Sequence, residues 1–259
     1  MYEHILVDTK RGSATITLNR PDKSNAMNGK LVSELRQALS EVSHNDEARV
    51  IVIKGAGKNF CGGADLGWMK TMSESSKSEN LDDALSLATL LHTLYTFPKP
   101  TMVLAQGAAF GGALGLLAAA DIVLAADNII ASFSEIKMAL APSTISPYVI
   151  AAIGARAARY YFLTGARFNA YEAYQMGLIH RIVPALQLDE EGDALAIELA
   201  NNSLHAMKEI KSLIAEVSDE SINKTLSQKT AEHLVNMRIS PDAQEGLNAF
   251  LEKRAPKWR

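Results

Sequence analysis

The sequence predicts an α/β fold in which helices cover a largely parallel sheet. Strand-like and helical segments alternate through the first half of the chain, which is the order expected of layered α/β proteins. The β-branched run Val50–Ile53 is apolar throughout, as in a strand buried on both faces. Two glycine-rich segments, Phe60–Leu66 and Phe110–Leu114, follow predicted strands.

The remaining elements of the first half follow from the same patterns. A strand at Ala14–Leu18 precedes a turn at Asn19–Asp22. Two more strands are expected at Met102–Ala105 and Ile122–Ala125, with a helix at Ala113–Ala120 between them. Apolar residues at helical spacing predict two earlier helices, marked by Leu31, Leu35, Leu39 and Val42 and by Leu81, Leu85, Ala88 and Tyr95.

From Ser146 onwards the pattern is mostly helical. Ser146-Pro147 is a cap and first turn for a helix running to about Tyr161. Asn169 can cap a short helix closed by Gly177. The last helix is expected to begin at Ser240-Pro241, and its apolar side carries Leu247, Phe250 and Leu251.

A polar tract between Trp68 and Asp82 interrupts the alternation. It includes Ser73–Asn80, which is too polar and too poor in apolar periodicity to join a core. We expect a mobile loop beside the glycine-rich segments, with an inert solvated connector as the alternative.

Composition bounds the class of protein. A chain of 259 residues that is 47% hydrophobic can form one large domain, or a domain with a helical appendage. The net charge of −3 provides no basic field for nucleic acid or an anionic membrane, so neither partner is expected. The single cysteine, Cys61, excludes an internal disulfide and a cysteine-rich metal site, and no histidine has ligand spacing, so we expect no metal. We find no secretory signal, and we expect a cytoplasmic location.

The two glycine-rich segments predict a site for an oxyanion. Glycines where a strand turns into a helix let backbone N–H groups approach a ligand oxygen closely. Two such turns can converge on one carbonyl and hold it as it becomes an enolate, although close packing alone would also explain the glycines. Glu135, in an otherwise apolar stretch, favours the catalytic interpretation over a surface glutamate paired with Lys137.

These segments together resemble the crotonase (enoyl-CoA hydratase/isomerase) superfamily over essentially the whole chain. The matching pieces, in order, are Leu18–Pro21 with Asn25–Met27, Phe60–Leu66, Gly107–Asp121, Phe162–Gly165, Gly177-Leu178, and Glu245-Gly246 with Phe250. The resemblance implies a crotonase-like (ClpP/crotonase) spiral of ββα units over residues 1–198. It also implies a helical C-terminal trimerisation region over residues 199–259, assembled as a homotrimer or a dimer of trimers.

The resemblance further implies an acyl-CoA thioester substrate and no cofactor, since coenzyme A is part of the substrate. Its oxyanion amides would be those of Ala64 and Gly112. Trp68 and Met69 would line the acyl tunnel or only anchor the loop. The implied substrate-binding residues are Lys23, Ala26, Gly62, Ala64, Asp65, Leu66, Gly111, Gly112, Gly115, Pro142, Phe250 and Lys253.

The resemblance implies that the reaction depends on which of the family's two glutamate positions carry a carboxylate. Typical hydratases of the family carry one glutamate three residues after the oxyanion glycine and a second in the next strand–loop segment. Gly115 occupies the first position here, and Glu135 matches the second. A raised pKa through partial burial would suit Glu135 as the general acid/base.

Hydration of a 2-enoyl-CoA, or the reverse dehydration, is therefore the leading expectation. The segment Ala141–Tyr148 resembles the bacterial 3-methylglutaconyl-CoA hydratase branch, whose members also occur with glycine at the first position, and this would place the protein in leucine degradation or fatty acid metabolism. Δ3,Δ2-enoyl-CoA isomerisation by one carboxylate is the alternative. RNA binding is less expected, because the helix of Leu31–Val42 has no basic row.

Overall fold

The computed structural model describes residues 2–258, which fold as two compact units. The first unit comprises residues up to Ile197, and the second begins at Glu198. The first unit contains all of the strands within the described residues, together with the two glycine-rich segments.

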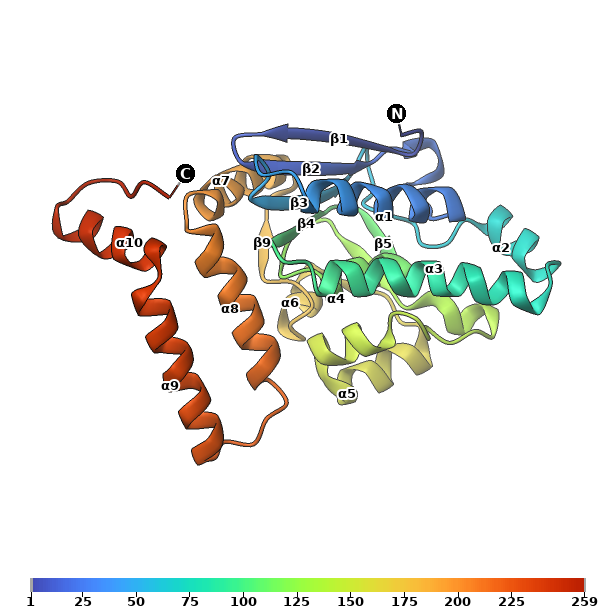
Figure 1. Ribbon diagram of the computed structural model, residues 1–259. Coiled ribbons are helices and arrows are strands. Elements are labelled where there is room, and N and C mark those ends of the chain that lie inside the picture. Colours follow the sequence, from blue (N-terminus) through green and yellow to red (C-terminus); the bar gives the residue numbers. More distant parts are fainter. Residues whose placement is uncertain (1, 259) are drawn as a thin grey trace. The chain divides into compact units, whose positions relative to one another are not determined.

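A six-stranded sheet forms the centre of the first unit (Figure 1). Its order is β1-β2-β3-β4-β6-β9, and only the β1–β2 pair is antiparallel. The predicted strands are confirmed, and β1 and β9 were not predicted. The bounds are β1 Ile5–Lys10, β2 Ser13–Leu18, β3 Val50–Gly55, β4 Thr101–Ala105, β6 Ile122–Ala126 and β9 Arg181–Val183.

A second sheet of three short strands lies in the same unit. Its order is β5-β7-β8, with bounds Ala108–Phe110, Ile130–Ser132 and Phe168–Asn169. The β5–β7 pair is parallel. This pairing fixes the direction in which the chain enters the second glycine-rich segment at the end of β5. This mixed α/β architecture, repeated as strand, strand and helix, is the crotonase fold that the sequence predicts.

Two helices pack on one another beside the main sheet, α1 (Gly29–Ser43) and α3 (Lys77–Tyr95) (Figure 1). The α1 helix begins where the Asn28 side chain accepts a hydrogen bond from the Leu31 amide, and it buries the face that the sequence predicts. The second predicted helix is confirmed as α3, but most of the apolar residues that mark it are not in the core. Its buried residues are Leu90, Leu91 and Leu94, whereas Leu81, Leu85 and Tyr95 are exposed. The first half of α3 borders a cavity and does not enter the core.

The polar tract between Trp68 and Asp82 is helical, so the expectation of a loop is wrong. The α2 helix (Leu66–Ser73) begins where the Asp65 carboxylate accepts hydrogen bonds from the amides of Gly67 and Trp68. A capping box between Ser76 and Glu79 then starts α3. Polar residues at helix starts satisfy backbone amides that would otherwise lack partners, which is why composition alone misread this tract.

Four later helices begin in the first unit. These are α4 (Gly112–Ala119), α5 (Ser146–Thr164), α6 (Ala170–Gln175) and α7 (Leu188–Ala200), the last of which runs into the second unit. The α5 helix begins at Ser146 as predicted, although Ile145 precedes it as the N-cap and provides no side-chain hydrogen bond. Asn169 forms a capping box at the start of α6, as predicted. A residue with φ of 73°, Gly154, interrupts α5. Short 3-10 turns cover Pro21–Lys23, Ser134–Met138 and Ala185–Gln187.

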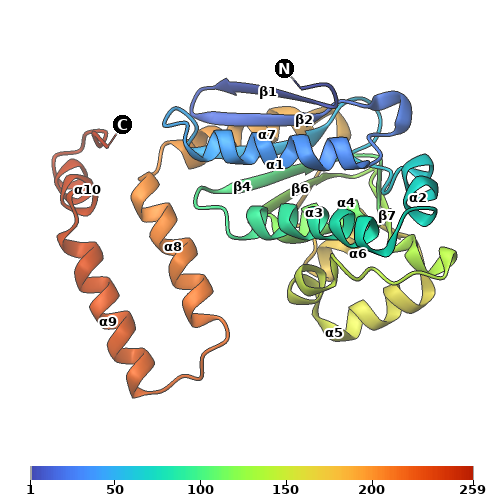
Figure 2. The ribbon, with the colours of Figure 1, turned by 45° about the vertical axis from the view of Figure 1, so that its right-hand side comes forward.

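The second unit is helical, as Figure 2 shows. It consists of α8 (Leu204–Val217), α9 (Lys224–Ile239) and α10 (Pro241–Leu251), and Ser240 caps α10 as predicted. After α10, the guanidinium of Arg254 binds both carboxylate oxygens of Glu245, at 2.6 and 3.0 Å. Among residues 2–258, no helix is both long and apolar enough to cross a membrane.

Candidate active site

The two glycine-rich segments lie side by side. Cys61 and Ala109 form a parallel β-bridge, in which the Cys61 amide donates to the Ala108 carbonyl at 3.0 Å and the Phe110 amide donates to the Cys61 carbonyl at 3.1 Å. Because the pairing is parallel, residues equally far beyond the bridge lie at the same end. Ala64 and Gly112 are each three residues beyond it.

The amide of Ala64 is left free by its neighbours. The Met27 amide donates to the Gly63 carbonyl at 2.7 Å, and the Asp65 amide donates to the Met27 carbonyl at 2.8 Å. These bonds fix the peptide groups on both sides of Ala64, yet its own N–H has no acceptor within residues 2–258. An unpaired, positioned N–H is the group that an oxyanion needs.

Gly112 provides a second free amide at the first residue of α4. The preceding residue, Gly111, has φ 51° and ψ −122°, and its amide donates to the Ser132 carbonyl at 3.0 Å. This fixes the turn and leaves the Gly112 N–H without an acceptor among the described residues. The helix dipole of α4 adds partial positive charge at the same point.

Glu135 lies against this turn. A β-carbon at Gly111 would be 3.1 Å from Glu135 Oε1, so the absence of a side chain at Gly111 makes room for the carboxylate. The other oxygen, Oε2, is buried and has no hydrogen-bond partner within residues 2–258. Burial raises the pKa of Glu135 above its ordinary value. The ammonium of Lys137 donates to the Thr164 carbonyl at 2.9 Å, so the alternative of a Glu135–Lys137 ion pair is wrong.

A cavity of about 420 Å³ connects these groups. Its wall includes Ala64, Gly112 and Glu135, and Pro142 also lies on it as the sequence predicts. Trp68 and Met69 line it too, and their place along an acyl chain stays a prediction. The other lining residues are mainly apolar or small and come from α1, α2, α3 and the segment before α5: Met27, Asn28, Val32, Met72, Ser73, Asn80, Asp83, Ala84, Leu87, Leu140, Ala141, Ser143, Thr144 and Ile145.

A second cavity of about 440 Å³ meets the first at Ala64. It is lined by the predicted substrate-binding residues of the first glycine-rich segment and of the turn before α1, together with Ser24, Gly67, Ala108 and Phe110. The predicted residues in its wall are Lys23, Ala26, Gly62, Ala64, Asp65 and Leu66. Ala64 thus borders both cavities. A thioester bound with its acyl chain in one cavity and its coenzyme A portion in the other would pass this residue.

The carboxylate of Asp65 is already occupied. It accepts from the guanidinium of Arg20 at 2.9 Å and caps α2. Arg20 also donates to the Ala26 carbonyl, so it joins the two segments that flank the Ala64 amide. Asp65 thus connects Arg20 to the start of α2, and the pKa of its carboxyl is lowered chiefly by the hydrogen bond from Arg20.

Gly115 lies outside the walls of both cavities. It is buried in α4, and a β-carbon there would be 2.5 Å from Ile145 Cγ2 and 3.1 Å from Leu91 Cδ1. The space where the family's first glutamate would begin is therefore filled by apolar side chains. Ile145 was not identified from the sequence, because nothing in its local pattern indicates contact with a glycine thirty residues earlier.

Phe250 and Lys253 belong to the second unit. Phe250, on α10, is 80% exposed, and Lys253 follows that helix with φ of 54°. Their assignment to the substrate pocket stays a prediction. Met27 and Asp83 are site residues that the sequence analysis missed, since neither belongs to a glycine-rich segment.

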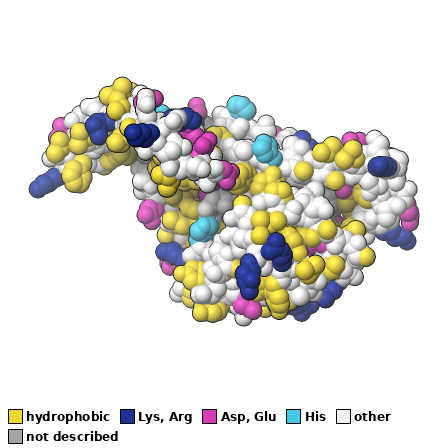
Figure 3. All heavy atoms as spheres, turned by 90° about the horizontal axis from the view of Figure 1, so that it is seen from below, with side chains coloured by type: hydrophobic (Ala, Val, Ile, Leu, Met, Phe, Trp, Pro, Cys, Tyr) yellow, Lys and Arg dark blue, Asp and Glu magenta, His cyan; other side chains and the backbone are white. Residues whose placement is uncertain are grey.

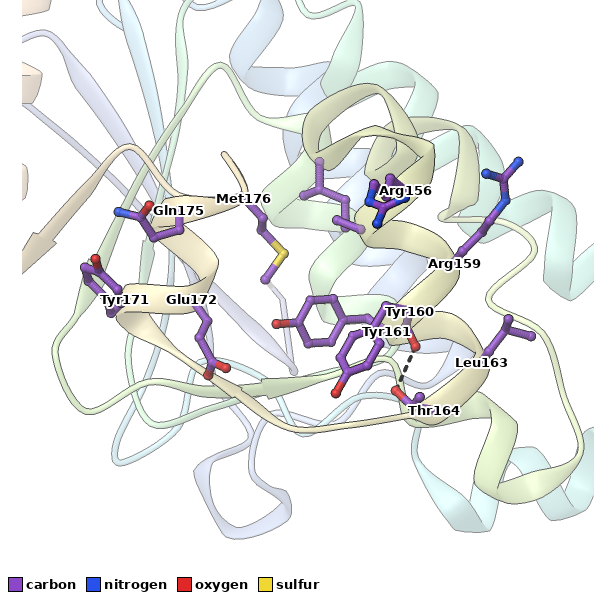
Figure 4. A pocket seen from close by; sticks show the side chains of 12 residues that line it. Arg156, Arg159, Tyr160, Tyr161, Leu163, Thr164, Tyr171, Glu172, Gln175 and Met176 are labelled. Atoms are coloured by element: carbon purple, nitrogen blue, oxygen red, sulfur yellow. Dashed lines mark hydrogen bonds between the residues drawn. The ribbon is translucent and has the colours of Figure 1, made fainter.

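A larger cavity, of about 1010 Å³, lies between α5 and α6 (Figure 4). Tyrosines and arginines line it, with Tyr160 and Tyr161 in edge contact at 5.0 Å, and it contains none of the predicted site residues. Figure 3 shows hydrophobic and basic side chains together on the face seen from below. We assign the site by its chemistry and not by its size. The cavities of about 420 and 440 Å³ lie beside the free amides of Ala64 and Gly112 and the carboxylate of Glu135, and the larger cavity does not. No three His, Cys, Asp or Glu side chains cluster as metal ligands would in residues 2–258.

Comparison with known proteins identifies the family of the chain. The family model described as Enoyl-CoA hydratase/isomerase matches residues 8–259. An enoyl-CoA hydratase structure from Shewanella pealeana is 40% identical, with a TM-score of 0.95 over 100% of this chain and 97% of that one. A Legionella pneumophila structure, named “putative enoyl CoA hydratase/isomerase (crotonase)”, is 39% identical, with a TM-score of 0.97 over 100% of both chains.

A relative that is named for a specific reaction is less similar to this chain. The carnitinyl-CoA dehydratase of Proteus mirabilis is 32% identical over 265 residues, which cover 97% of each chain. A full-length family match and relatives above 30% identity are decisive for membership. The chain is an enzyme of the enoyl-CoA hydratase/isomerase (crotonase) family.

Proposed function

We propose that the protein adds water to a 2-enoyl-CoA, or removes it from the corresponding 3-hydroxyacyl-CoA. The observation that carries this proposal is the buried, unpaired Glu135 carboxylate beside the free amides of Ala64 and Gly112. Relatives named as a hydratase and a dehydratase support water as the second reactant.

One carboxylate is enough for a balanced reaction. Glu135 takes a proton from water as the C3–O bond forms, and the double-bond electrons move to C2 and the thioester oxygen. The amides of Ala64 and Gly112 stabilise that enolate oxygen. Glu135 then returns the proton to C2, which leaves the carboxylate as it began.

The two cavities suggest how substrate lies. The acyl chain would occupy the cavity of about 420 Å³, and the coenzyme A portion would follow the cavity of about 440 Å³ past Lys23 and Leu66. The thioester would lie at Ala64, the residue common to both walls. No cofactor enters this scheme.

Isomerisation of a 3-enoyl-CoA is the second candidate. Ile145 and Leu91 fill the space at Gly115, so a second carboxylate that would position water is missing there. Glu135 would remove a proton from C2 and return it at C4, with the dienolate oxygen held by the same amides. This reaction needs no water.

Replacement of Glu135 by Gln tests the role of the carboxylate. We expect turnover to fall by at least about a hundredfold with near-normal binding of a saturated acyl-CoA, because Gln keeps the shape and removes the base. Exposed Glu190, on α7, provides the control, and Glu190→Gln should match the wild type. Equal losses in both variants would end the assignment.

Substrate comparison separates the two candidates. Crotonyl-CoA reports hydration, and a 3-enoyl-CoA reports isomerisation, in the same purified protein. Turnover of the 3-enoyl substrate alone would replace hydration by isomerisation.

A further inference from the structure

The cavity of about 420 Å³ carries two acidic side chains and no basic one. Its wall, within the described residues, holds Glu135 and Asp83 but no Lys, Arg or His. The reaction needs Glu135, whereas it gives Asp83 no role. An unexplained carboxylate in a mainly apolar binding cavity affects which ligands can enter.

Asp83 is held in place by its neighbour on α2. The Trp68 Nε1–H donates to Asp83 Oδ1 at 3.0 Å. The indole cannot easily move away, because a β-carbon at Gly29 would be only 2.6 Å from its ring. Trp68 is thus packed against the first residue of α1, and it fixes the carboxylate at the wall.

The position of Asp83 follows from the axis of α3. Leu87 on this helix lies beside Gly112, at 3.9 Å from a β-carbon built there. Asp83 precedes Leu87 by one turn, which is about 6 Å along the helix. A short acyl chain starting at the Gly112 amide has a similar length, so its far end would lie near Asp83.

The other polar side chains on the wall are uncharged, so none of them provides a cation to offset this charge. The Asn80 amide group already donates to the carbonyls of Met72, Ser75 and Ser76. Asn28 Oδ1 already accepts from the Leu31 amide. A ligand carboxylate brought into this cavity would lose its hydration and gain no cation.

We propose that Asp83 is a specificity-determining residue that makes the acyl cavity select uncharged acyl chains and reject chains with a distal carboxylate. The inference rests on the proposed function for the location of the acyl chain. It departs from the 3-methylglutaconyl substrate that the sequence favours. Specificity of this kind comes from an unfavourable contact with the wrong ligand as much as from a favourable one with the right ligand.

Binding of saturated analogues tests the inference without any chemistry. We expect wild-type protein to bind butyryl-CoA at least about tenfold more tightly than glutaryl-CoA, as measured by calorimetry. Asp83→Asn should narrow this ratio to less than about threefold, mostly by tighter binding of glutaryl-CoA. The variant keeps an oxygen for the Trp68 N–H, so folding should be preserved.

Asp82→Asn is the matched control. Asp82 is exposed, lies one residue earlier on the same helix, and is outside the cavity wall. The Asp82→Asn substitution removes the same charge from α3 and should leave the ratio of butyryl-CoA to glutaryl-CoA affinity unchanged. Equal binding of the two ligands by wild type, or equal ratios in wild type and Asp83→Asn, would overturn the inference.

Turnover assays distinguish this result from failure of the proposed function. Discrimination in binding without turnover of either 2-enoyl-CoA would support the selection by Asp83 and refute hydration. Turnover of glutaconyl-CoA as efficient as that of crotonyl-CoA would refute the selection and retain hydration.

Discussion

At the scale of single residues, the ionised form of Glu135 is less stable than that of an ordinary surface glutamate. One carboxylate oxygen is buried without a partner, and burial raises its pKa. Desolvation disfavours the charged form of an acid, so the folded state holds the proton more tightly than the unfolded chain does. The burial that suits Glu135 to act as a base therefore lowers the free energy of unfolding of the protein at neutral pH.

This linkage predicts the effect of Glu135→Gln on thermal unfolding. As pH rises from the ordinary pKa of a glutamate through the raised pKa of Glu135, the stability of the wild type falls relative to the variant. The variant should therefore unfold at a higher temperature than wild type near pH 8, and the difference should shrink towards pH 4. Melting curves across this range check it, with Glu190→Gln as control. A variant less stable at every pH would contradict the linkage.

Sequence and structure differ instructively at the residues of the site. Glu135 and the amides of Ala64 and Gly112 could be located by counting along motifs, since local turns fix them. The engagement of Asp65 by Arg20, and the contact of Ile145 with Gly115, join residues distant in sequence. No periodicity within one segment predicts such contacts.

At the scale of elements, the absence of a side chain at Gly115 lets α4 pack closely against Ile145, the residue before α5. A β-carbon at this position would overlap Ile145. We expect Gly115→Glu alone to lower the free energy of unfolding by at least about 1–3 kcal/mol, because overpacking in a core is destabilising.

The partner variant tests the cause of that loss. Ile145→Ala should cost about 2–5 kcal/mol by leaving a cavity, yet the double variant should lose less than the sum of the two. Urea unfolding of the four proteins measures the coupling. Additive losses would show that the two positions do not share the space.

Elements with strong caps and long apolar runs were predictable, and short ones were not. The helices α6 and α10 carry their signals locally, since Asn169 and Ser240 cap them as predicted. Strands of two or three residues, such as β7 and β8, form only because partner strands are present. The α2 helix was missed because the polar run at residues 73–80 outweighed both the apolar residues before it and the capping residue, Asp65.

At the scale of the whole molecule, the second unit leaves many apolar side chains exposed. Leu234, Val235, Ile239, Phe250 and Leu251 are each more than half exposed, with values from 52% to 80%. Large exposed apolar surface marks association sites in soluble proteins. This supports the prediction of a trimer or a dimer of trimers, which remains to be measured.

Charge placed on this surface tests the prediction. Phe250→Asp should lower the molar mass measured by light scattering from that of a trimer or hexamer, because an interface cannot bury an unpaired carboxylate. Ser221→Asp, at an exposed position of the same unit, should leave the mass unchanged. A monomeric wild type would contradict the assembly.

The buried thiol beneath the first glycine-rich segment has a consequence for durability. An α,β-unsaturated thioester is a Michael acceptor, and thiolates are the nucleophiles that it alkylates. Cys61 is the only cysteine of the chain and lies three residues before Ala64, yet it is buried, and this raises its pKa to about 12. Burial thus keeps the thiol protonated at neutral pH and away from solvent, so we expect it to resist alkylation by an unsaturated thioester.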